Sequence, residues 1–388
     1  MLFNESQIAV REMAERFAKE VLSPGYQKRE AQDFIDRDLM KQMGSLGLIG
    51  VDLGEEYGGL DESSVTAGMI TEAIAYGDFN VSYIQVMASL MGAILHRNAS
   101  KDLALHWNSR LVAGEAIIGL GLTEPGTGSD AANLQCRARK DGSDYVLSGE
   151  KTSITYAGQA DAFIVFARTG GPESGARGVS AFLVPGRSTG LSSSRFNDVG
   201  SKIIGRGSLF FDEVRVPAGN LLGEEGKGFT EVMAGFDYSR ILIALQCLAA
   251  AQASIDETWE YSKQRKAMGA PIVQYQGVSF PIVEFETQIA ACRALCYQGL
   301  ELHDAGLPHT AESAMVKWMG PKVSFDTIHQ CILTFGHYGW SMDSPHQQRL
   351  RDVMGLEIGD GTAQIMKLVI ARERAGRVAV QYAKESRK

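Results

Sequence analysis

The feature that most constrains the fold is a change in hydrophobic period along the chain. Residues 119–225 carry short runs rich in β-branched and aromatic residues, which Gly, Pro and Ser separate. On both sides, apolar residues recur at helical spacing instead. Because no long helical pattern separates the strands, we expect an antiparallel sheet rather than a parallel one. The sequence therefore predicts an α+β protein with a helical domain over 1–118, a β domain over 119–227 and a second helical domain over 228–388.

Local patterns predict the individual elements. Strands are expected at 145–151, 162–167, 179–184 and 209–216, and helices at about 63–76, 82–97, 101–113, 229–263, 281–303, 311–335 and 362–380. Asn4 and Gln7 have the spacing of a capping box, which predicts a helix that begins after Asn4. The glycine-rich stretch 44–59 reads as a loop, and Pro321 is expected to kink or break its helix.

The bulk composition is that of a soluble globular protein. Of 388 residues, 45% are apolar and 22% are charged, as in proteins that form two or three domains. The net charge of −8 argues against nucleic acid or an anionic membrane surface as the main partner, although one basic cluster can still bind phosphates. The first residues do not read as a signal peptide, and no stretch is expected to reach the length of a membrane-spanning helix. We therefore expect a cytoplasmic protein without membrane insertion.

The five cysteines are thinly spread, which indicates a reducing compartment rather than a disulfide framework. Cys292 and Cys296 lie four residues apart in a helical pattern. Core packing is the expected role of this pair, since free cysteines are often buried, and redox or metal chemistry is the alternative. No other Cys or His stands nearby at zinc-ligand spacing, so the sequence predicts no metal site.

A glycine-rich segment at 121–130 reads Gly-Leu-Thr-Glu-Pro-Gly-Thr-Gly-Ser-Asp. Gly126 and Gly128 allow a ligand to approach the backbone without a Cβ in the way. The hydroxyls of Thr123 and Ser129 offer hydrogen bonds to such a ligand. Taken alone, the segment is also compatible with an ordinary loop, because the chain contains 43 glycines.

A second glycine-flanked segment, at 358–365, reads Ile-Gly-Asp-Gly-Thr-Ala-Gln-Ile. Together the two segments resemble the signature regions of the acyl-CoA dehydrogenase family of flavoproteins, and the resemblance extends from about residue 3 to 380. It implies an N-terminal helical domain, a middle β domain and a C-terminal four-helix bundle. It also implies FAD as cofactor, an acyl-CoA substrate and an electron-transferring flavoprotein as electron acceptor. The family usually forms homotetramers with the flavin at a subunit interface.

The resemblance assigns cofactor contacts residue by residue. The stretch Lys-Thr-Ser-Ile-Thr at 151–155 is similar to the family's Lys-x-Trp-Ile-Thr, so Thr155 is retained and Ser153 replaces the Trp. That replacement removes an aromatic wall from the flavin; without the resemblance, Thr155 is an ordinary strand residue. The implied flavin contacts from this stretch and the two glycine-rich segments are Leu122, Thr123, Gly128, Ser129, Ser153, Thr155, Thr362 and Gln364.

A further motif, Asp237-Tyr-Ser-Arg240, resembles the family segment whose Asp and Arg help form the acyl-CoA cavity. The implied substrate contacts are Ser129, Asp237, Arg240 and Gly361. We expect the motif to open a helix, where Asp237 alone would read as a charge favoured by the helix dipole. Some relatives place the catalytic glutamate just before the Arg, but Ser239 cannot act as a carboxylate base here.

Two segments in the C-terminal half resemble parts of the family that contact the cofactor, and the first of them reaches the cofactor of a neighbouring subunit in that family. Arg265 and Gln276 match the first of these, and the planar guanidinium of Arg265 suits a pyrophosphate. This role requires an oligomer; a merely solvated Arg265 is the alternative. The second, Leu-Thr-Phe-Gly-His-Tyr-Gly at 333–339, departs from the family at Leu333 and His337, so no contact is assigned to them.

The family's catalytic base is a glutamate in a Glu-Gly-Thr triplet, and this chain has Asp360-Gly361-Thr362 instead. Dehydrogenating a thioester requires a base for the proton beside the carbonyl and a hydride acceptor at the next carbon, which the flavin N5 provides. Hydrogen-bond donors must also stabilise the thioester oxygen. We predict that Asp360 is the base, with a turn residue as the alternative.

The aspartate also bears on the substrate. Asp reaches roughly 1.3 Å less far than Glu, and a misplacement of this size can cost about a hundredfold in rate. Gly359 stands where relatives often carry Tyr, which widens the pocket. A short base and a wide pocket favour a ring-bearing acyl group, and the segment resembles the cyclohexanecarboxyl-CoA dehydrogenases. Diene-forming relatives place an Asp in the N-terminal helices, but residues 82–98 contain no acid, which favours a simple 1,2-dehydrogenation.

Three alternatives remain open from the sequence. The first is a dehydrogenase for short or branched acyl chains, carried on CoA or on a carrier protein. The second is a flavin oxidase or monooxygenase of the same fold, because Ser153 opens the flavin face. The third is a non-catalytic acyl-CoA-binding protein, which the retained carboxylate at Asp360 disfavours.

Overall fold

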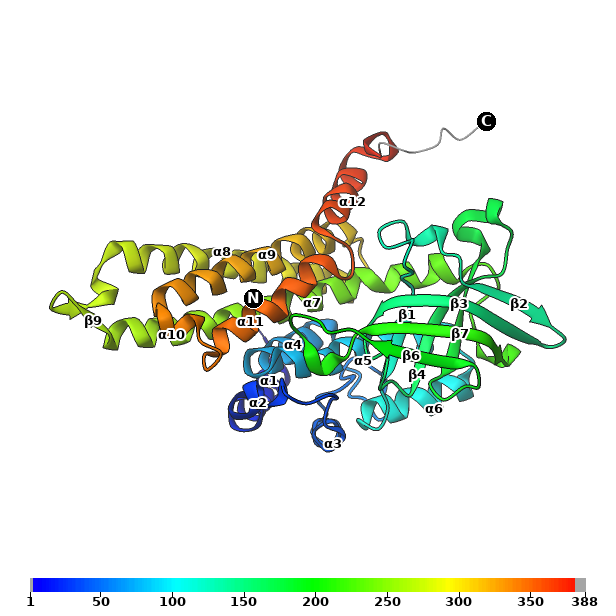
Figure 1. Cartoon of the computed structure of the whole chain (residues 1–388), viewed down its shortest axis with the longest axis horizontal. Helices are drawn as coiled ribbons and strands as arrows, with labels where there is room; N and C mark the ends of the chain where they lie inside the picture. The colour runs from blue at the N-terminus through cyan, green and yellow to red at the C-terminus, as the bar shows by residue number, and fades with distance from the viewer. Residues whose placement is uncertain (1–2, 381–388) are drawn as a thin grey trace. The chain divides into compact units, whose positions relative to one another are not determined.

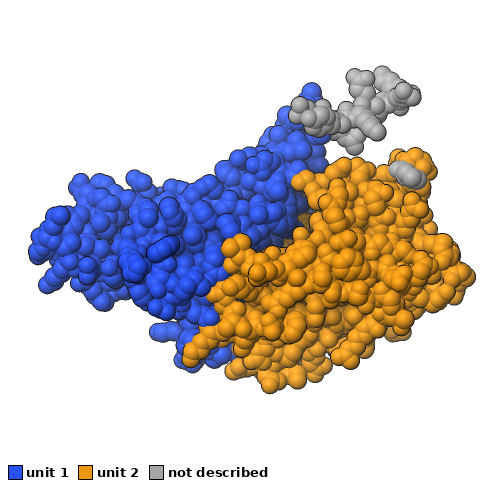
Figure 2. All heavy atoms as spheres, in the orientation of Figure 1, with its two compact units in different colours: residues 1–27, 68–82, 240–388 blue, residues 28–67, 83–239 orange. Residues whose placement is uncertain are grey.

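The computed structural model describes residues 3–380, and their side chains except at 172, 231–234 and 377. The chain divides into two compact units, which Figure 2 colours blue and orange. Within the described residues, unit 1 comprises the chain up to 27, 68–82 and the chain from 240 onward, and unit 2 comprises 28–67 and 83–239. Both units are therefore assembled from segments that are distant in sequence.

The helices agree closely with the apolar periods of the sequence. They are α1 (Glu5–Phe17), α2 (Tyr26–Arg29), α3 (Arg37–Ser45), α4 (Ser64–Gly77), α5 (Phe79–Asn98), α6 (Lys101–Val112), α7 (Gly228–Gln264), α8 (Gln276–Asp304), α9 (Thr310–Phe335), α10 (His337–Trp340), α11 (Pro345–Ile358) and α12 (Ala363–Ala375). The capping box of α1 is confirmed, because the side chains and backbone N–H groups of Asn4 and Gln7 bond reciprocally. The stretch 44–59 is mainly loop, with a short 3-10 turn inside it.

Unit 1 is a helical bundle in which α8, α9 and α11 run alongside one another (Figure 1). The sequence did not predict α11, because its buried face carries polar residues that hide the apolar period. Pro345 occupies its first turn, and the Ser344 hydroxyl accepts a hydrogen bond from the backbone of His346. The predicted break at Pro321 is wrong, since α9 continues through this residue. The helix packs closely on α7 beside this residue, since a Cβ added at Gly320 would lie 3.0 Å from Ala244, and such tertiary packing overrides local helix propensity.

Two helices correct the expectation that no stretch reaches membrane-spanning length. By length and composition, Phe79–Asn98 and Gly228–Gln264 are long and apolar enough to cross a bilayer. Most of each apolar window is buried inside the protein, as in the core helices of soluble proteins. Their apolar character is therefore explained by packing.

Unit 2 contains the β domain. Its strands are β1 (Ile118–Gly121), β2 (Arg137–Asp141), β3 (Asp144–Ile154), β4 (Ala162–Arg168), β5 (Val179–Pro185), β6 (Leu191–Arg195), β7 (Gly207–Val216) and β8 (Leu221–Leu222). They form one sheet in the order β6-β7-β3-β2-β4-β5-β8, with β1 paired to β4. The pairings are antiparallel as expected, except that β1 and β2 each run parallel to β4. The extra short strands were missed because several are exposed and polar, such as Leu-Ser-Ser-Ser-Arg in β6.

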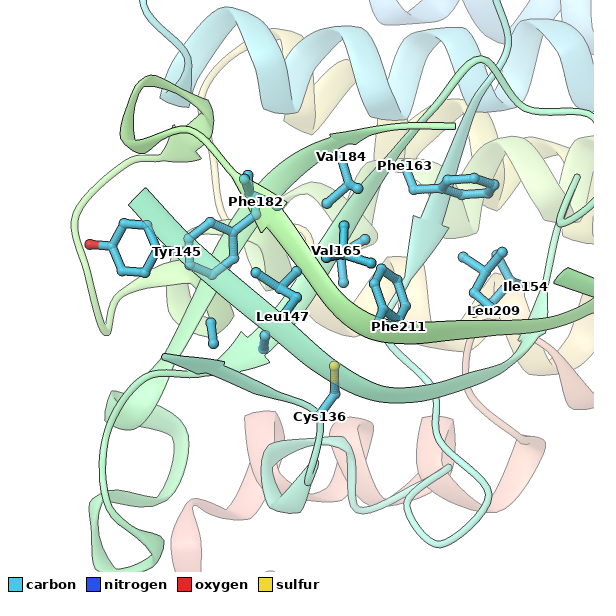
Figure 3. Packing of buried hydrophobic residues seen from close by; sticks show 14 of the residues in the cluster. Cys136, Tyr145, Leu147, Ile154, Phe163, Val165, Phe182, Val184, Leu209 and Phe211 are labelled. Carbon is cyan, nitrogen blue, oxygen red and sulfur yellow. The ribbon is translucent and has the colours of Figure 1, made fainter. Parts of the chain in front are cut away.

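The core of the β domain is built from alternate residues of its long strands (Figure 3). The labelled side chains from β3, β4, β5 and β7 point toward one another, and most of this cluster is fully buried. Ile154, near the end of β3, belongs to this cluster. The core thus fixes the end of β3, where the predicted flavin-contacting residues follow.

The small hairpin of β9 (Lys266–Ala267) and β10 (Ala270–Pro271) connects α7 to α8 in unit 1. It lies at the end of the bundle that is far from α12 (Figure 1).

Candidate active site

The first two motifs meet in unit 2 through one buried side chain, that of Lys151. Its ammonium donates hydrogen bonds to the carbonyl oxygen of Leu122 at 3.1 Å and to the carboxylate of Glu124 at 2.6 Å. The backbone N–H of Thr152 donates to the carbonyl of Thr123 at 2.8 Å. The segment after β1 and the end of β3 are thereby held together, so the residues predicted to contact the flavin lie at one edge of the sheet.

The ion pair of Lys151 and Glu124 at this edge is buried. Lys151 is 0% exposed and Glu124 is 6% exposed. The Glu124 carboxylate also accepts hydrogen bonds from the backbone N–H groups of Gln135 and Cys136. Burial lowers the pKa of Lys151, and the negative charge of Glu124 opposes this shift. Burial raises the pKa of the Cys136 thiol to about 11, so this cysteine is neutral at physiological pH.

The glycine-rich loop has the features that a close-fitting ligand requires. A Cβ added at Gly126 or Gly128 would meet nothing within 4 Å, so the space beside the backbone is open. The hydroxyl of Thr127 is buried and has no hydrogen-bond partner among the described residues. Ser129 is exposed, while Leu122 and Thr123 are half-buried. The loop therefore offers accessible backbone and hydroxyl groups at the position where a cofactor is expected.

Ser153 stands at an irregularity at the end of β3. The pairing register of β3 with β7 shifts between Lys151 and Ile154, and Ser153 has a left-handed φ of 58°. Because Ile154 packs in the core, Ser153 lies exposed and Thr155 follows in a half-buried turn. No aromatic side chain stands at position 153, as the sequence indicates.

Asp360 lies in the connection between α11 and α12 in unit 1. Gly359 is extended, Asp360 adopts a left-handed φ of 59°, and Gly361 has a φ of 98°. Asp tolerates this conformation better than most residues, which fits the turn. Thr362 caps α12 by accepting a hydrogen bond from the backbone of Ile365 at 3.4 Å. Asp360 is half-buried, and so are Gly361 and Thr362, while Gln364 is exposed.

A buried lysine that the sequence reasoning missed lies beneath this loop. Lys317, on α9, is 1% exposed and donates to the carbonyl oxygens of Leu356 at 2.7 Å and Gly361 at 3.1 Å. Burial lowers the pKa of Lys317, whereas the negative charge of Asp360 raises it. The positive charge of Arg240 lowers the pKa further. Asp360 and Arg240 thus share one electrostatic environment with Lys317.

The motif that contains Asp237 and Arg240 does not open a helix, which corrects the prediction. It lies well inside α7, which begins at Gly228. A helix dipole acts mainly on the first turn, so it does not account for Asp237. Asp237 is half-buried and Arg240 is 7% exposed. The helix expected over 229–263 agrees with α7, so only the expectation that this motif opens the helix was wrong.

The remaining predicted cofactor contacts lie elsewhere in unit 1. Arg265 and Gln276 flank the β9–β10 hairpin and are exposed. The ring of Phe335 stacks on Tyr261 at 4.2 Å, which places the turn after α9 beside the end of α7. His337 is exposed on α10, where its ring makes an edge contact with Trp340 at 6.2 Å. The structure therefore groups Arg265, Gln276 and this turn at one end of the bundle.

An acid contacts α5 even though residues 82–98 contain none. The Asp52 carboxylate accepts hydrogen bonds from the hydroxyls of Ser89 at 2.7 Å and Tyr238 at 2.8 Å. The Ser89 hydroxyl also accepts from the Gln85 amide at 3.0 Å. A search along one helix could not find this carboxylate, because a loop supplies it. The absence of an acid within α5 is therefore weaker support for a 1,2-dehydrogenation than the sequence indicated.

Family comparisons identify the scaffold. Models of the N-terminal, middle and C-terminal domains of acyl-CoA dehydrogenases match residues 4–115, 119–214 and 226–375. The chain belongs to the acyl-CoA dehydrogenase family. The cyclohexane-1-carbonyl-CoA dehydrogenase of Geobacter metallireducens is 33% identical over 96% of this chain and 98% of its own length.

Solved structures of family members agree with this assignment. The butyryl-CoA dehydrogenase of Megasphaera elsdenii aligns with a TM-score of 0.92 at 31% identity, over 97% of this chain and all of that chain. PigA with FAD and proline aligns with a TM-score of 0.92 at 27% identity, over 97% of this chain and 99% of PigA. This acyl-CoA dehydrogenase is thus an FAD-dependent oxidoreductase, and its open glycine loop and buried Thr127 hydroxyl fit the cofactor.

Proposed function

We propose that this acyl-CoA dehydrogenase oxidises a cyclic acyl-CoA, such as cyclohexane-1-carboxyl-CoA, at the α and β carbons. The observation that carries the proposal is the loop at 359–361, where a short base follows a glycine. A Cβ at Gly359 would meet only ordinary contacts, the nearest at 3.5 Å, so the backbone leaves room for a side chain that is absent. That room suits a bulky acyl group beside the shorter carboxylate.

In this proposal Asp360 removes the α-proton. The breaking C–H bond leaves its electron pair on the α-carbon, and the proton passes to the Asp360 carboxylate. FAD supplies the hydride acceptor when bound. The left-handed backbone conformation of Asp360 sets the directions of its backbone N–H and of its Cα–Cβ bond. Arg240 shares the electrostatic environment of this base, and we assign it and Asp237 to acyl-CoA binding.

The positions of the predicted cofactor-contacting residues support an oligomer. From Arg240 to the end of α7 at Gln264, the helix rises by roughly 36 Å. Arg265 therefore lies too far away to touch a flavin ring beside Asp360 of the same chain. We propose that Arg265 and Gln276 contact the cofactor of another copy in a homo-oligomer, a tetramer by family precedent. Exposed apolar side chains at this end of the bundle are consistent with an interface: Met268, Leu333, Tyr338, Trp340 and Met342.

We also propose an electron-transferring flavoprotein as the electron acceptor, by family precedent, and a cytoplasmic location. The second candidate function is a dehydrogenase for short acyl chains, because the butyryl-CoA enzyme is about as similar as the cyclic one. The flavin oxidase alternative rests on Ser153, because this exposed serine leaves position 153 without an aromatic side chain to cover the flavin. Oxygen consumption during turnover would reveal an oxidase.

Anaerobic mixing with a panel of thioesters tests the proposal. The panel contains cyclohexanecarboxyl-, isobutyryl-, butyryl- and octanoyl-CoA. The measured signal is the bleaching of the flavin absorption. We expect the fastest bleaching with the cyclic thioester. Asp360→Ala should slow it by about a hundred- to ten-thousandfold, as for other general bases. The matched control is Asp343→Ala, an exposed aspartate in unit 1. Bleaching only by linear or branched chains would reject the cyclic substrate and retain the enzyme class.

A further inference from the structure

The loop that carries Asp360 is hydrogen-bonded to a side chain of another helix. Lys317 on α9 bonds to Leu356, in the last turn of α11, and to Gly361, directly after Asp360. Asp360 therefore lies between the two anchored carbonyl groups. The last carbonyls of a helix lack partners within it, so Lys317 also satisfies one of the unpaired groups of α11.

We propose that Lys317 is a positioning residue for the base, which fixes the Leu356–Gly361 segment through two hydrogen bonds and favours the ionised Asp360 carboxylate through its charge. The inference rests on the proposed role of Asp360. Lys317 itself is buried at 1% exposure and its donors face backbone carbonyls, so it acts through the loop.

The charges around Lys317 support an electrostatic role. Asp360, Cys247 and Glu357 raise its pKa, while burial and Arg240 lower it. Burial also raises the pKa of Cys247, so that thiol is neutral near pH 7. Among these groups, Asp360 has the largest charge effect on Lys317. Because the attraction is mutual, the lysine stabilises the carboxylate form that accepts the proton.

The conformation of the loop explains why an anchor matters. Asp360, at a φ of 59°, lies in the left-handed region, which costs a non-glycine residue free energy, whereas Gly361 adopts its φ of 98° without that cost. Without the two hydrogen bonds, the segment can relax and move the carboxylate. A shift of about 1 Å at a catalytic group costs on the order of a hundredfold in rate.

Two variants of Lys317 separate position from charge. Lys317→Met removes both the donors and the charge, and Lys317→Gln keeps an amide donor without the charge. Lys322→Met is the matched control, because Lys322 is an exposed lysine of the same helix that pairs with Asp326. Each protein is compared per bound FAD by anaerobic bleaching across pH, with the thioester that the wild type oxidises fastest.

We expect kcat/KM for Lys317→Met to fall by on the order of a hundredfold. The acid limb of its pH profile should move upward by roughly one unit, because the carboxylate has lost a stabilising cation. Lys317→Gln should show the same pH shift with a smaller rate loss, and Lys322→Met should match the wild type. Amide hydrogen exchange over residues 356–362 should accelerate about tenfold in Lys317→Met, since the anchored turn opens more often.

Wild-type rates and an unchanged acid limb in both Lys317 variants would overturn the inference. If Lys317→Met does not retain FAD, the rate and the acid limb of Lys317→Gln alone test the inference. A wild type that no thioester bleaches would reject the proposed function instead. Hydrogen exchange would then still test whether Lys317 anchors the segment, because that reading needs no substrate.

Discussion

Two loops of this protein rest on buried lysines, but the two lysines have different partners. In unit 2, Lys151 contacts a carboxylate, Glu124, at 2.6 Å as well as a carbonyl. In unit 1, Lys317 donates hydrogen bonds to two carbonyl oxygens, and a carboxylate, Asp360, acts on it electrostatically. The first lysine forms a buried ion pair with Glu124, which belongs to the glycine-rich segment 121–130. The second bonds to the backbone on either side of Asp360 and stabilises the carboxylate of Asp360 through its charge.

The difference shows how one residue type can serve two purposes. A direct, fully hydrogen-bonded ion pair is a fixed anchor, because breaking it leaves a buried charge. A lysine bonded to carbonyl groups holds the backbone, while its charge stabilises the nearby carboxylate. Exchanging the partners of the two lysines would therefore lower the stability of the fold at Lys151 and impair the proposed proton transfer to Asp360 at Lys317.

The largest effect is expected from Lys151→Met. This change leaves the Glu124 carboxylate buried at 6% exposure without its cation, and we expect a loss of about 3–5 kcal/mol in the free energy of unfolding. Urea denaturation with a constant m-value measures the loss. Adding Glu124→Gln should recover a large part of it, because an amide needs no counter-ion. An unaltered urea midpoint in the single variant would show that the ion pair is not the anchor.

The same substitution in the two glycine loops should have opposite consequences. At Gly361, a φ of 98° strains any side chain, so Gly361→Ala should displace the base and slow bleaching by about a hundredfold with FAD retained. At Gly128, an added Cβ meets no protein atom within 4 Å, so the free energy of unfolding of Gly128→Ala should equal that of the wild type. Its FAD affinity should fall about tenfold, because the methyl group occupies the approach to the backbone. Wild-type bleaching by Gly361→Ala, or wild-type FAD affinity in Gly128→Ala, would contradict this contrast.

The smallest effect concerns the acyl group. Gly359 has an ordinary extended backbone, and a Cβ there meets nothing closer than 3.5 Å, so Gly359→Tyr should fold normally. The ring should fill the room beside Asp360 and lower kcat/KM for the cyclic thioester by about tenfold, with butyryl-CoA affected less. Gly359→Ala is the control of small volume. Parallel losses for both thioesters would argue against a pocket widened for rings.

Much of the fold was predictable, because the periods of the apolar residues report which side of each element is buried. One helix that the sequence did not predict, α11, buries His346, Arg349 and Asp352, which have partners within unit 1. Arg349 pairs with Glu257 at 2.8 Å, and Asp352 accepts a hydrogen bond from Tyr26 at 2.7 Å. A helix that buries ionic groups has no apolar stripe, so periodicity cannot reveal it.

The site was predictable only where a side chain is recognised by its motif. Asp360 and Thr155 were found in this way, and their roles stay predictions. Lys317 was missed, because its partners are backbone carbonyls and any residue can supply those. One signal was present: Lys317 lies among Ala314, Pro321 and Ile328 on the buried face of α9, where a lone charge needs an explanation.

The division into two units has a consequence for synthesis on the ribosome. Unit 2 ends at residue 239, whereas unit 1 joins the first 27 residues to a bundle that begins at residue 240. Tyr26 and Asn80 both bond to Asp352, so these N-terminal segments emerge long before their partner. Domains generally fold as units during translation. When residue 239 has left the ribosome, the nascent chain contains every residue of unit 2. The part of unit 1 from residue 240 onward, with which the N-terminal segments pack, has not yet emerged.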